Sequence, residues 1–135
     1  MIRLDFISYI KTLKPVDWNK QVSDKWTVKD VVAHMIGWEK EDTKVIGLTW
    51  KTKKRPWFYE TDHYDDFNNK YVEYYKNYTP EQLIKEWGKY QKQAQEEINR
   101  IGEDKLKKYP DLFGRLFDEG KIVIMGDIIR GLRRL

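Results

Sequence analysis

The chain has 135 residues, a net charge of +4, and a composition that is 40% hydrophobic and 15% aromatic. A domain of this length can bury about two-thirds of its unfolded surface, and large rings add much buried area, which argues against a disordered chain. The absence of Cys excludes disulfides, thiolate metal sites and a Cys nucleophile. No apolar run is long enough for a bilayer and no secretory signal begins the sequence, so we expect a cytoplasmic protein without a membrane partner.

The first predicted helix covers residues 2 to 13, where apolar side chains recur at helical spacing. Pro15 ends it, because proline is disfavoured in a helix interior. We interpret residues 16 to 26 as a loop. In this loop we expect Trp18 and Val22 to fold back on the core.

The clearest helix in the sequence is predicted from about residue 28 to residue 48. Thr27 is its N-cap, and Asp30 stands in the capping-box position, near the positive end of the helix dipole. One face of this helix carries apolar residues at helical spacing: Val28, Val31, Val32, Met35, Ile36, Val45 and Ile46.

A long crossing connection, residues 47 to 61, is predicted to follow this helix. Asp62 is expected to cap a short extra helix with aromatic side chains at three- and four-residue steps, and Tyr78 closes it. The segment Thr79-Pro-Glu-Gln82 combines an N-cap Thr, a Pro at the first helical position and a capping-box Gln. It predicts a third long helix that continues to the stop at Gly102.

Residues 103 to 120 read as irregular, and a last amphipathic helix is predicted from Lys121 to Leu135. Alternation of apolar and polar residues with period two is absent over any useful length, so we predict no sheet. The chain is therefore expected to be all-α, a four-helix bundle that forms a single domain over residues 1 to 135. A long crossover joins its second and third helices.

The stretch Trp26-Thr-Val-Lys-Asp-Val-Val-Ala-His34-Met-Ile-Gly-Trp38-Glu39 resembles the DinB/YfiT-like superfamily. Members often carry the pattern Trp-(Ser/Thr)-x-x-(Asp/Glu)-x-x-x-His at the start of their second helix. They include DinB-like metalloenzymes, the mycothiol-dependent maleylpyruvate isomerase type and the ClbS/DfsB type. Asp66-Phe67-Asn68, followed by Tyr78 to Leu83, resembles their entry into the third helix. The resemblance covers about residues 5 to 101 and implies a left-handed up-up-down-down bundle.

The resemblance also implies a divalent metal, held in many members by a second-helix His and by two His at four-residue spacing on the last helix. Only the first position is matched here, by His34. The predicted last helix has no His, so the usual second and third ligands are absent and the metal site is incomplete. Related types handle thiol adducts or electrophilic toxins, which implies that this chain binds or transforms a small molecule in a detoxification-type role.

His34 is the foremost candidate for a catalytic or metal-binding residue. Its position is on the flank of the apolar face, with Asp30 one turn before it and Glu41 about two turns after it. In that setting an imidazole suits metal ligation or general base chemistry. We favour the alternative, a structural or ligand-contacting His whose ring bonds Asp30 or a backbone carbonyl and packs on Trp38.

A second hypothesis for a metal joins His34 and His63 to a carboxylate from Asp66 or Glu41. Two His and one carboxylate suit Fe, Mn or Zn. The alternative, which we favour, is that the acidic residues around His63 complement the start of the helix and that His63 is exposed.

We expect a pocket between the second, third and fourth helices, lined by His34, Trp38 and crossover aromatics such as Trp57. Arg130 on the last helix would bind an anionic ligand there if its side chain turned inward. The alternative is that the terminal arginines interact with the negative end of their own helix.

Two other functions remain open from the sequence. The crossover from Trp50 to Tyr59 interleaves cations with aromatics, a pattern that serves nucleic-acid binding by phosphate pairing and base stacking. We prefer the alternative, in which its aromatics face inward over the bundle and its lysines face outward. The other function is a non-catalytic dimeric scaffold that docks through the last helix. Phosphate loops, dinucleotide fingerprints, zincin helices and nucleophile elbows are absent from the sequence.

Overall fold

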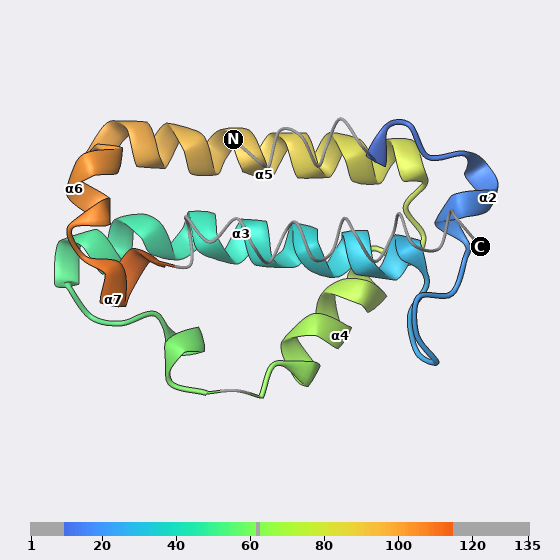
Figure 1. Ribbon diagram of the computed structural model, residues 1–135, viewed down its shortest axis with the longest axis horizontal. Coiled ribbons are helices and arrows are strands. Elements are labelled where there is room, and N and C mark those ends of the chain that lie inside the picture. The colour runs from blue at the N-terminus through green and yellow to red at the C-terminus, as the bar shows by residue number, and fades with distance from the viewer. Residues whose placement is uncertain (1–9, 62, 115–135) are drawn as a thin grey trace.

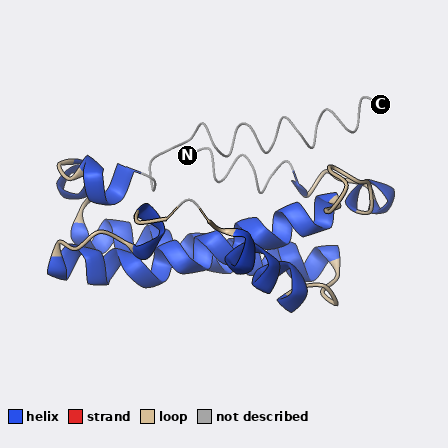
Figure 2. Cartoon of the chain, turned by 90° about the horizontal axis from the view of Figure 1, so that it is seen from below, coloured by secondary structure: helices blue, strands red, loops and turns tan. Residues whose placement is uncertain are grey.

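The computed structural model describes residues 10–61 and 63–114, and in these ranges the named elements are helices joined by loops (Figure 1, Figure 2). The β-type pairing in this part of the chain is an isolated antiparallel bridge between Gln21 and Thr27. The predicted all-α class is confirmed. Nearly all of the first predicted helix, the whole of the last one, and Asp62 lie outside the described residues. None of the described helices has the combination of length and apolarity needed to cross a membrane.

The longest described helix is α3 (Val28–Thr52), and it begins as predicted. The Thr27 hydroxyl accepts the Asp30 backbone N–H at 3.3 Å, and the Asp30 carboxylate accepts the Thr27 N–H at 3.0 Å. The helix ends later than predicted, at Lys53, which takes a left-handed conformation with φ 57°. The extra turn is held because Thr49 and Trp50 continue the packed face beyond Ile46. Residues 47 to 52 are therefore helical, and the crossover begins at residue 53.

The second long helix, α5 (Pro80–Ile101), also begins with a reciprocal cap. Thr79 and Gln82 exchange backbone-to-side-chain bonds of 2.8 and 3.2 Å, and Gly102 ends the helix with φ 110°. The shorter α4 (Asp65–Tyr74) precedes it, with Tyr64 as its N-cap. The prediction that Asp62 caps this helix is therefore wrong, because the helix begins two residues further along.

The helices α3 and α5 lie side by side and run in the same direction (Figure 1). Their first halves share one hydrophobic cluster, which includes Val32 and Leu83, and their second halves share another, which includes Ile46 and Ile98. An up-up-down-down order requires the second and third long helices to run in opposite directions. That part of the prediction is wrong, because the crossover and α4 carry the chain back along α3 before α5 begins.

Three segments that were expected to be irregular form short helices: α2 (Pro15–Trp18), α6 (Glu103–Lys107) and α7 (Pro110–Phe113). Pro15 and Pro110 occupy the first helical position, where a missing N–H costs no hydrogen bond. A proline interpreted as a helix stop is thus a helix start in α2. Trp18 is buried as predicted, and Val22 packs against the first cluster.

Candidate functional site

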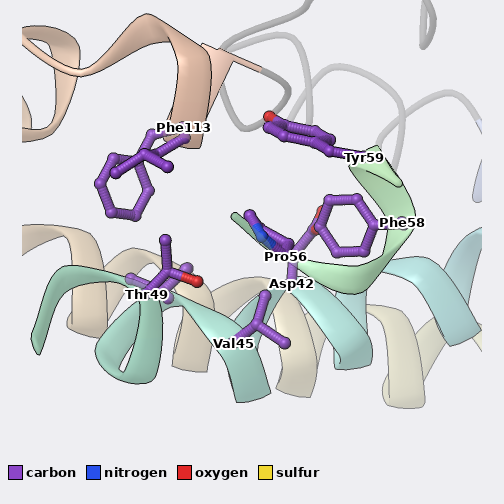
Figure 3. Close-up of a pocket in the computed structure, with 9 residues that line it drawn as sticks. Asp42, Val45, Thr49, Pro56, Phe58, Tyr59 and Phe113 are labelled. Atoms are coloured by element: carbon purple, nitrogen blue, oxygen red, sulfur yellow. The ribbon is translucent and has the colours of Figure 1, made fainter. Parts of the chain in front are cut away.

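A pocket lies where α3, the crossover turn η1 (Trp57–Tyr59) and α7 meet (Figure 3). It encloses about 220 Å³, open solvent at its mouth included. Between its walls there is room for about one water molecule. Most of its lining is apolar or aromatic, and the lining residues are Asp42, Val45, Ile46, Thr49, Pro56, Phe58, Tyr59, Leu112 and Phe113.

The aromatic walls are fixed by packing outside the pocket. Phe58 is 3% exposed and meets Trp38 edge-on, with ring centroids 5.6 Å apart. Phe113 is buried in the second hydrophobic cluster, 6.3 Å from the ring of Trp50. These contacts with rings outside the lining restrict both aromatic side chains.

Thr49 differs from the neighbouring threonines of α3. The hydroxyls of Thr43 and Thr52 each donate to a carbonyl four residues earlier, Glu39 O at 2.8 Å and Leu48 O at 2.9 Å. Thr49 is 3% exposed, lines the pocket, and its hydroxyl forms no hydrogen bond with any residue in the described ranges. In Figure 3 its side chain rises from α3 toward Phe113. The hydroxyl of this largely buried residue therefore belongs to the pocket lining and does not bond to its own helix.

Asp42 is the one charged side chain among the nine lining residues. Its residue is 6% exposed, and it precedes Thr49 by seven residues, which is about two helical turns. The two polar groups are thus spaced along one side of α3, with Val45 and Ile46 between them. This arrangement offers an ionisable acceptor and a hydroxyl at two points of an otherwise apolar pocket.

The structure brings together three residues predicted for the site. Trp57 donates its indole N–H to Glu41 Oε1 at 2.7 Å and stacks on Trp38, with ring centroids 5.8 Å apart and planes at 23°. Trp38 in turn donates to Asn68 Oδ1 on α4 at 2.7 Å. These contacts fasten the crossover to α3. None of the three lines the pocket at α7. The pocket predicted between the second, third and fourth helices involves residues outside the described ranges, so the place of Trp38 and Trp57 in it stays a prediction.

His34 is buried at the first cluster and is also absent from the pocket lining. Its Nδ1 lies 2.8 Å from the carbonyl of Val31, and because a carbonyl only accepts, Nδ1 carries the proton. The ring packs against Trp26, with centroids 4.8 Å apart. The predicted bond to a backbone carbonyl is confirmed, and the predicted packing on Trp38 stays a prediction.

The metal hypotheses fail among the described residues. His63 and Asp66 are exposed at the start of α4. Within residues 10–61 and 63–114, no three His, Asp or Glu side chains come together in a way that could hold a metal ion. The two-His, one-carboxylate site is therefore not formed among these residues, and the predicted last helix lies outside them. Arg130, predicted to bind an anion, lies outside the described residues.

The basic residues of the crossover contact aromatic rings. The ammonium group of Lys53 lies 3.5 Å from the centre of the Trp50 ring. The Arg55 guanidinium lies 5.3 Å from the Tyr59 ring and 3.7 Å from the Glu60 carboxylate. With Phe58 buried and the lysines exposed, the crossover packs largely as preferred, although Trp57 remains 40% exposed.

A tyrosine cluster lies near the other end of α3. Burial, more than any neighbouring charge, raises the pKa of Tyr71 and of Tyr75. The Tyr75 hydroxyl donates to Glu86 Oε2 at 3.2 Å, which raises the pKa of Tyr75 further. Lys40 lies 5.5 Å from the Tyr90 ring and 5.6 Å from the Tyr74 ring.

The sequence reasoning missed Asp42 and Thr49, although a signal for them exists. Both follow Val28 and Met35 at seven-residue steps, so they share the phase of the apolar face of α3. Polar residues at these positions indicate a polar site on the buried face of α3. No family model, curated protein or solved structure matches this chain.

Proposed function

We propose that this chain binds a small molecule in the pocket between α3, η1 and α7. The observation that carries the proposal is the lining itself, in which the Thr49 hydroxyl stands among apolar and aromatic side chains and forms no bond with described residues. A hydroxyl can donate one hydrogen bond and accept two, so a polar group of a bound ligand can bond to it. Ligand pockets typically combine apolar and aromatic walls with a few polar groups of this kind.

The size of the pocket limits the ligand. Its 220 Å³ includes open solvent at the mouth, and between its walls there is room for about one water molecule. The ligand is therefore a compound of few heavy atoms, or a small head group whose remainder stays outside the mouth.

The family resemblance extends the proposal. The Trp26 to Glu39 pattern spans the N-terminal cap and first turns of α3. We take the chain as a four-helix bundle of the DinB/YfiT-like type, in which small-molecule detoxification is the related activity. Fold likeness does not fix a function, so the pocket carries this proposal and the resemblance supports it.

Nucleic-acid binding is less well supported. Base stacking needs accessible ring faces, whereas Phe58 is buried and Trp57 stacks on Trp38. Lys53 and Arg55 already lie against Trp50 and Tyr59. The dimeric scaffold hypothesis depends on residues 121 to 135, which lie outside the described ranges.

The test is a fragment screen by ligand-observed NMR on the full chain. Val45→Trp places an indole in the pocket, and Leu48→Trp places the same side chain on an exposed position of the same helix. We expect fragments that bind the wild type to bind Leu48→Trp and to lose binding to Val45→Trp, with both variants folded by circular dichroism. Fragments that bind all three proteins alike would overturn the proposal.

A further inference from the structure

We infer that Tyr71, Tyr74 and Tyr90 form an aromatic cage that binds the methylated ammonium group of a small molecule. The cage is a second site, since none of the three lines the pocket between α3, η1 and α7. Tyr71 and Tyr74 belong to α4, and Tyr90 belongs to α5. The ammonium group of Lys40 on α3 lies 5.8, 5.6 and 5.5 Å from the centres of these rings. Ring faces attract cations within about 6 Å, so the three helices together build a cation site.

Packing holds the rings of the cage, and one of them borders solvent. Tyr71 is buried in the first hydrophobic cluster, and Tyr90 packs against the same cluster. The Tyr74 ring meets the Tyr75 ring edge-on, with centroids 4.8 Å apart, and Tyr74 is 58% exposed. The cage is therefore formed by the fold itself, and a ligand can reach it on the side of Tyr74.

The width of the cage fits a methylated ammonium better than a bare one. The Lys53 ammonium lies 3.5 Å from the centre of the Trp50 ring, which shows how closely a bare ammonium approaches a ring in this protein. The Lys40 ammonium comes no closer than 5.5 Å to any of its three ring centres. The difference exceeds a nitrogen–carbon bond of about 1.46 Å. Methyl groups on the nitrogen of a ligand would occupy this gap and touch the rings.

Lysine side chains from two further positions also lie on the rings of the cage. Lys70 lies 5.4 Å from the Tyr71 ring, and Lys89 lies 5.1 Å from the Tyr90 ring. A ligand would replace the ammonium of Lys40, whose flexible four-carbon stem lets it move into water, where a primary ammonium is strongly hydrated. The charge between the rings would then stay the same. A fully methylated ammonium has no N–H, so it gives up no hydrogen bond to water when it enters.

The test titrates the full chain with choline and with the neutral alcohol in which a tert-butyl group replaces the trimethylammonium group of choline. NMR follows the backbone amides of Lys40 and Tyr90, and sodium chloride keeps the ionic strength equal. One cation–π contact at an exposed site corresponds to about a two- to fivefold change in affinity. With three rings in the cage, we expect choline to bind at least about fivefold more tightly than the alcohol.

Two variants, each with a matched control, locate the binding. Lys40→Ala removes the competing ammonium and should tighten choline binding at least about twofold. Lys44→Ala, which removes an exposed lysine one turn further along α3, should leave it unchanged. Tyr74→Leu removes the accessible ring and should weaken choline binding about two- to fivefold. Tyr109→Leu, which removes a tyrosine that is 40% exposed outside the cage, should not.

Equal affinities of the wild type for choline and the neutral alcohol would overturn the inference. Choline binding that is weakened in Lys40→Ala, or unchanged in Tyr74→Leu, would also overturn it. If Tyr74→Leu fails to fold, the comparison of the two probes with the wild type and with Lys40→Ala still decides. Val45→Trp should bind choline as the wild type does, so failure of the proposed pocket leaves the cage standing. Loss of choline binding in that variant would assign it to the pocket and overturn the cage.

Discussion

The ring of Tyr71 lies directly against the backbone of Gly37, where α4 meets α3. A Cβ atom at position 37 would stand 2.5 Å from Cδ2 and 2.8 Å from Cβ of Tyr71. Carbon atoms in favourable contact are about 3.5–4.0 Å apart. Since the Cβ of Tyr71 is fixed to its backbone, the contact at 2.8 Å is relieved only if the backbone of α3 or α4 moves. A glycine inside a helix costs about 1 kcal/mol relative to alanine, and this close approach explains why α3 carries one here.

Gly37→Ala should therefore lower the free energy of unfolding by about 1–3 kcal/mol, as overpacked substitutions do, despite the better helix propensity of alanine. Gly47→Ala is the matched control in the same helix. Its added Cβ would meet Glu97 Oε2 at 3.3 Å and Arg100 Nη2 at 3.5 Å, which are ends of flexible side chains. We expect that variant to be neutral or stabilised by up to about 1 kcal/mol. Urea unfolding measures both, and effects of the same sign would contradict the close approach.

Trp57→Phe should loosen the crossover. Phenylalanine keeps a ring beside Trp38 but removes the indole N–H that donates to Glu41 Oε1 at 2.7 Å. Hydrogen bonds to charged groups contribute about 1.5–3 kcal/mol, and the partial exposure of Trp57 places the expected loss at the lower end. Amide exchange at Glu60, whose N–H bonds to Trp57 O at 3.0 Å, should become faster.

A double-mutant cycle with Glu41→Leu isolates this bond between Trp57 and Glu41. A coupling of about 0.5–3 kcal/mol is expected for residues in direct contact. Coupling close to zero would mean that the crossover is held by ring packing alone.

Ionisation of the Tyr75 phenol should lower the free energy of unfolding in alkaline solution. Burial, followed by the Glu86 charge, raises the pKa of the folded phenol above its ordinary value of 10.0. Below pH 10 the phenol is protonated in both states, so its contribution does not change with pH. Above pH 10 the unfolded chain loses this proton first, and stability falls by up to about 1.4 kcal/mol per pH unit.

Tyr75→Phe should flatten the decline of the urea midpoint above pH 10, at a cost near neutrality of about 1 kcal/mol for the bond to Glu86. The control is Tyr109→Phe, which removes a phenol that is 40% exposed. Its decline should match that of the wild type. If the urea midpoints of the wild type and of Tyr75→Phe decline in parallel above pH 10, folding does not raise the pKa of this phenol.

The features that the sequence predicted correctly are local. The boxes Thr27 with Asp30 and Thr79 with Gln82 involve residues three apart, so the chain encodes them without tertiary information. The direction of α5 relative to α3 depends on the path of the crossover, which no local pattern records. Likewise α7 is a single turn whose Phe113 is held by the second cluster, and tertiary packing overrides its irregular sequence.

The candidate site shows the same division. Trp38, Glu41 and Trp57 were identified because their residue types suit binding, but their contacts fasten the crossover. The pocket walls come from segments far apart in the chain, so no spacing rule places Phe58 opposite Phe113. The sequence places Asp42 on the apolar face of α3. It does not show that a pocket forms beside that position, because the other walls come from distant segments.

His34 is predicted to be structural. It is 5% exposed, donates from Nδ1 to the Val31 carbonyl at 2.8 Å, and packs on Trp26. His34→Ala leaves a cavity and a carbonyl without this donor, so the free energy of unfolding should fall by about 2–4 kcal/mol. His63→Ala, at an exposed position, should change it by about 0.5 kcal/mol or less. Fragment binding at the pocket should be unchanged in the folded fraction of both variants, because neither residue lines the pocket. Metal analysis of untagged protein provides the opposing outcome: stoichiometric metal in the wild type, lost in His34→Ala at wild-type stability, would make His34 a ligand. A large stability loss with unchanged metal content would assign its burial to the packing of α3.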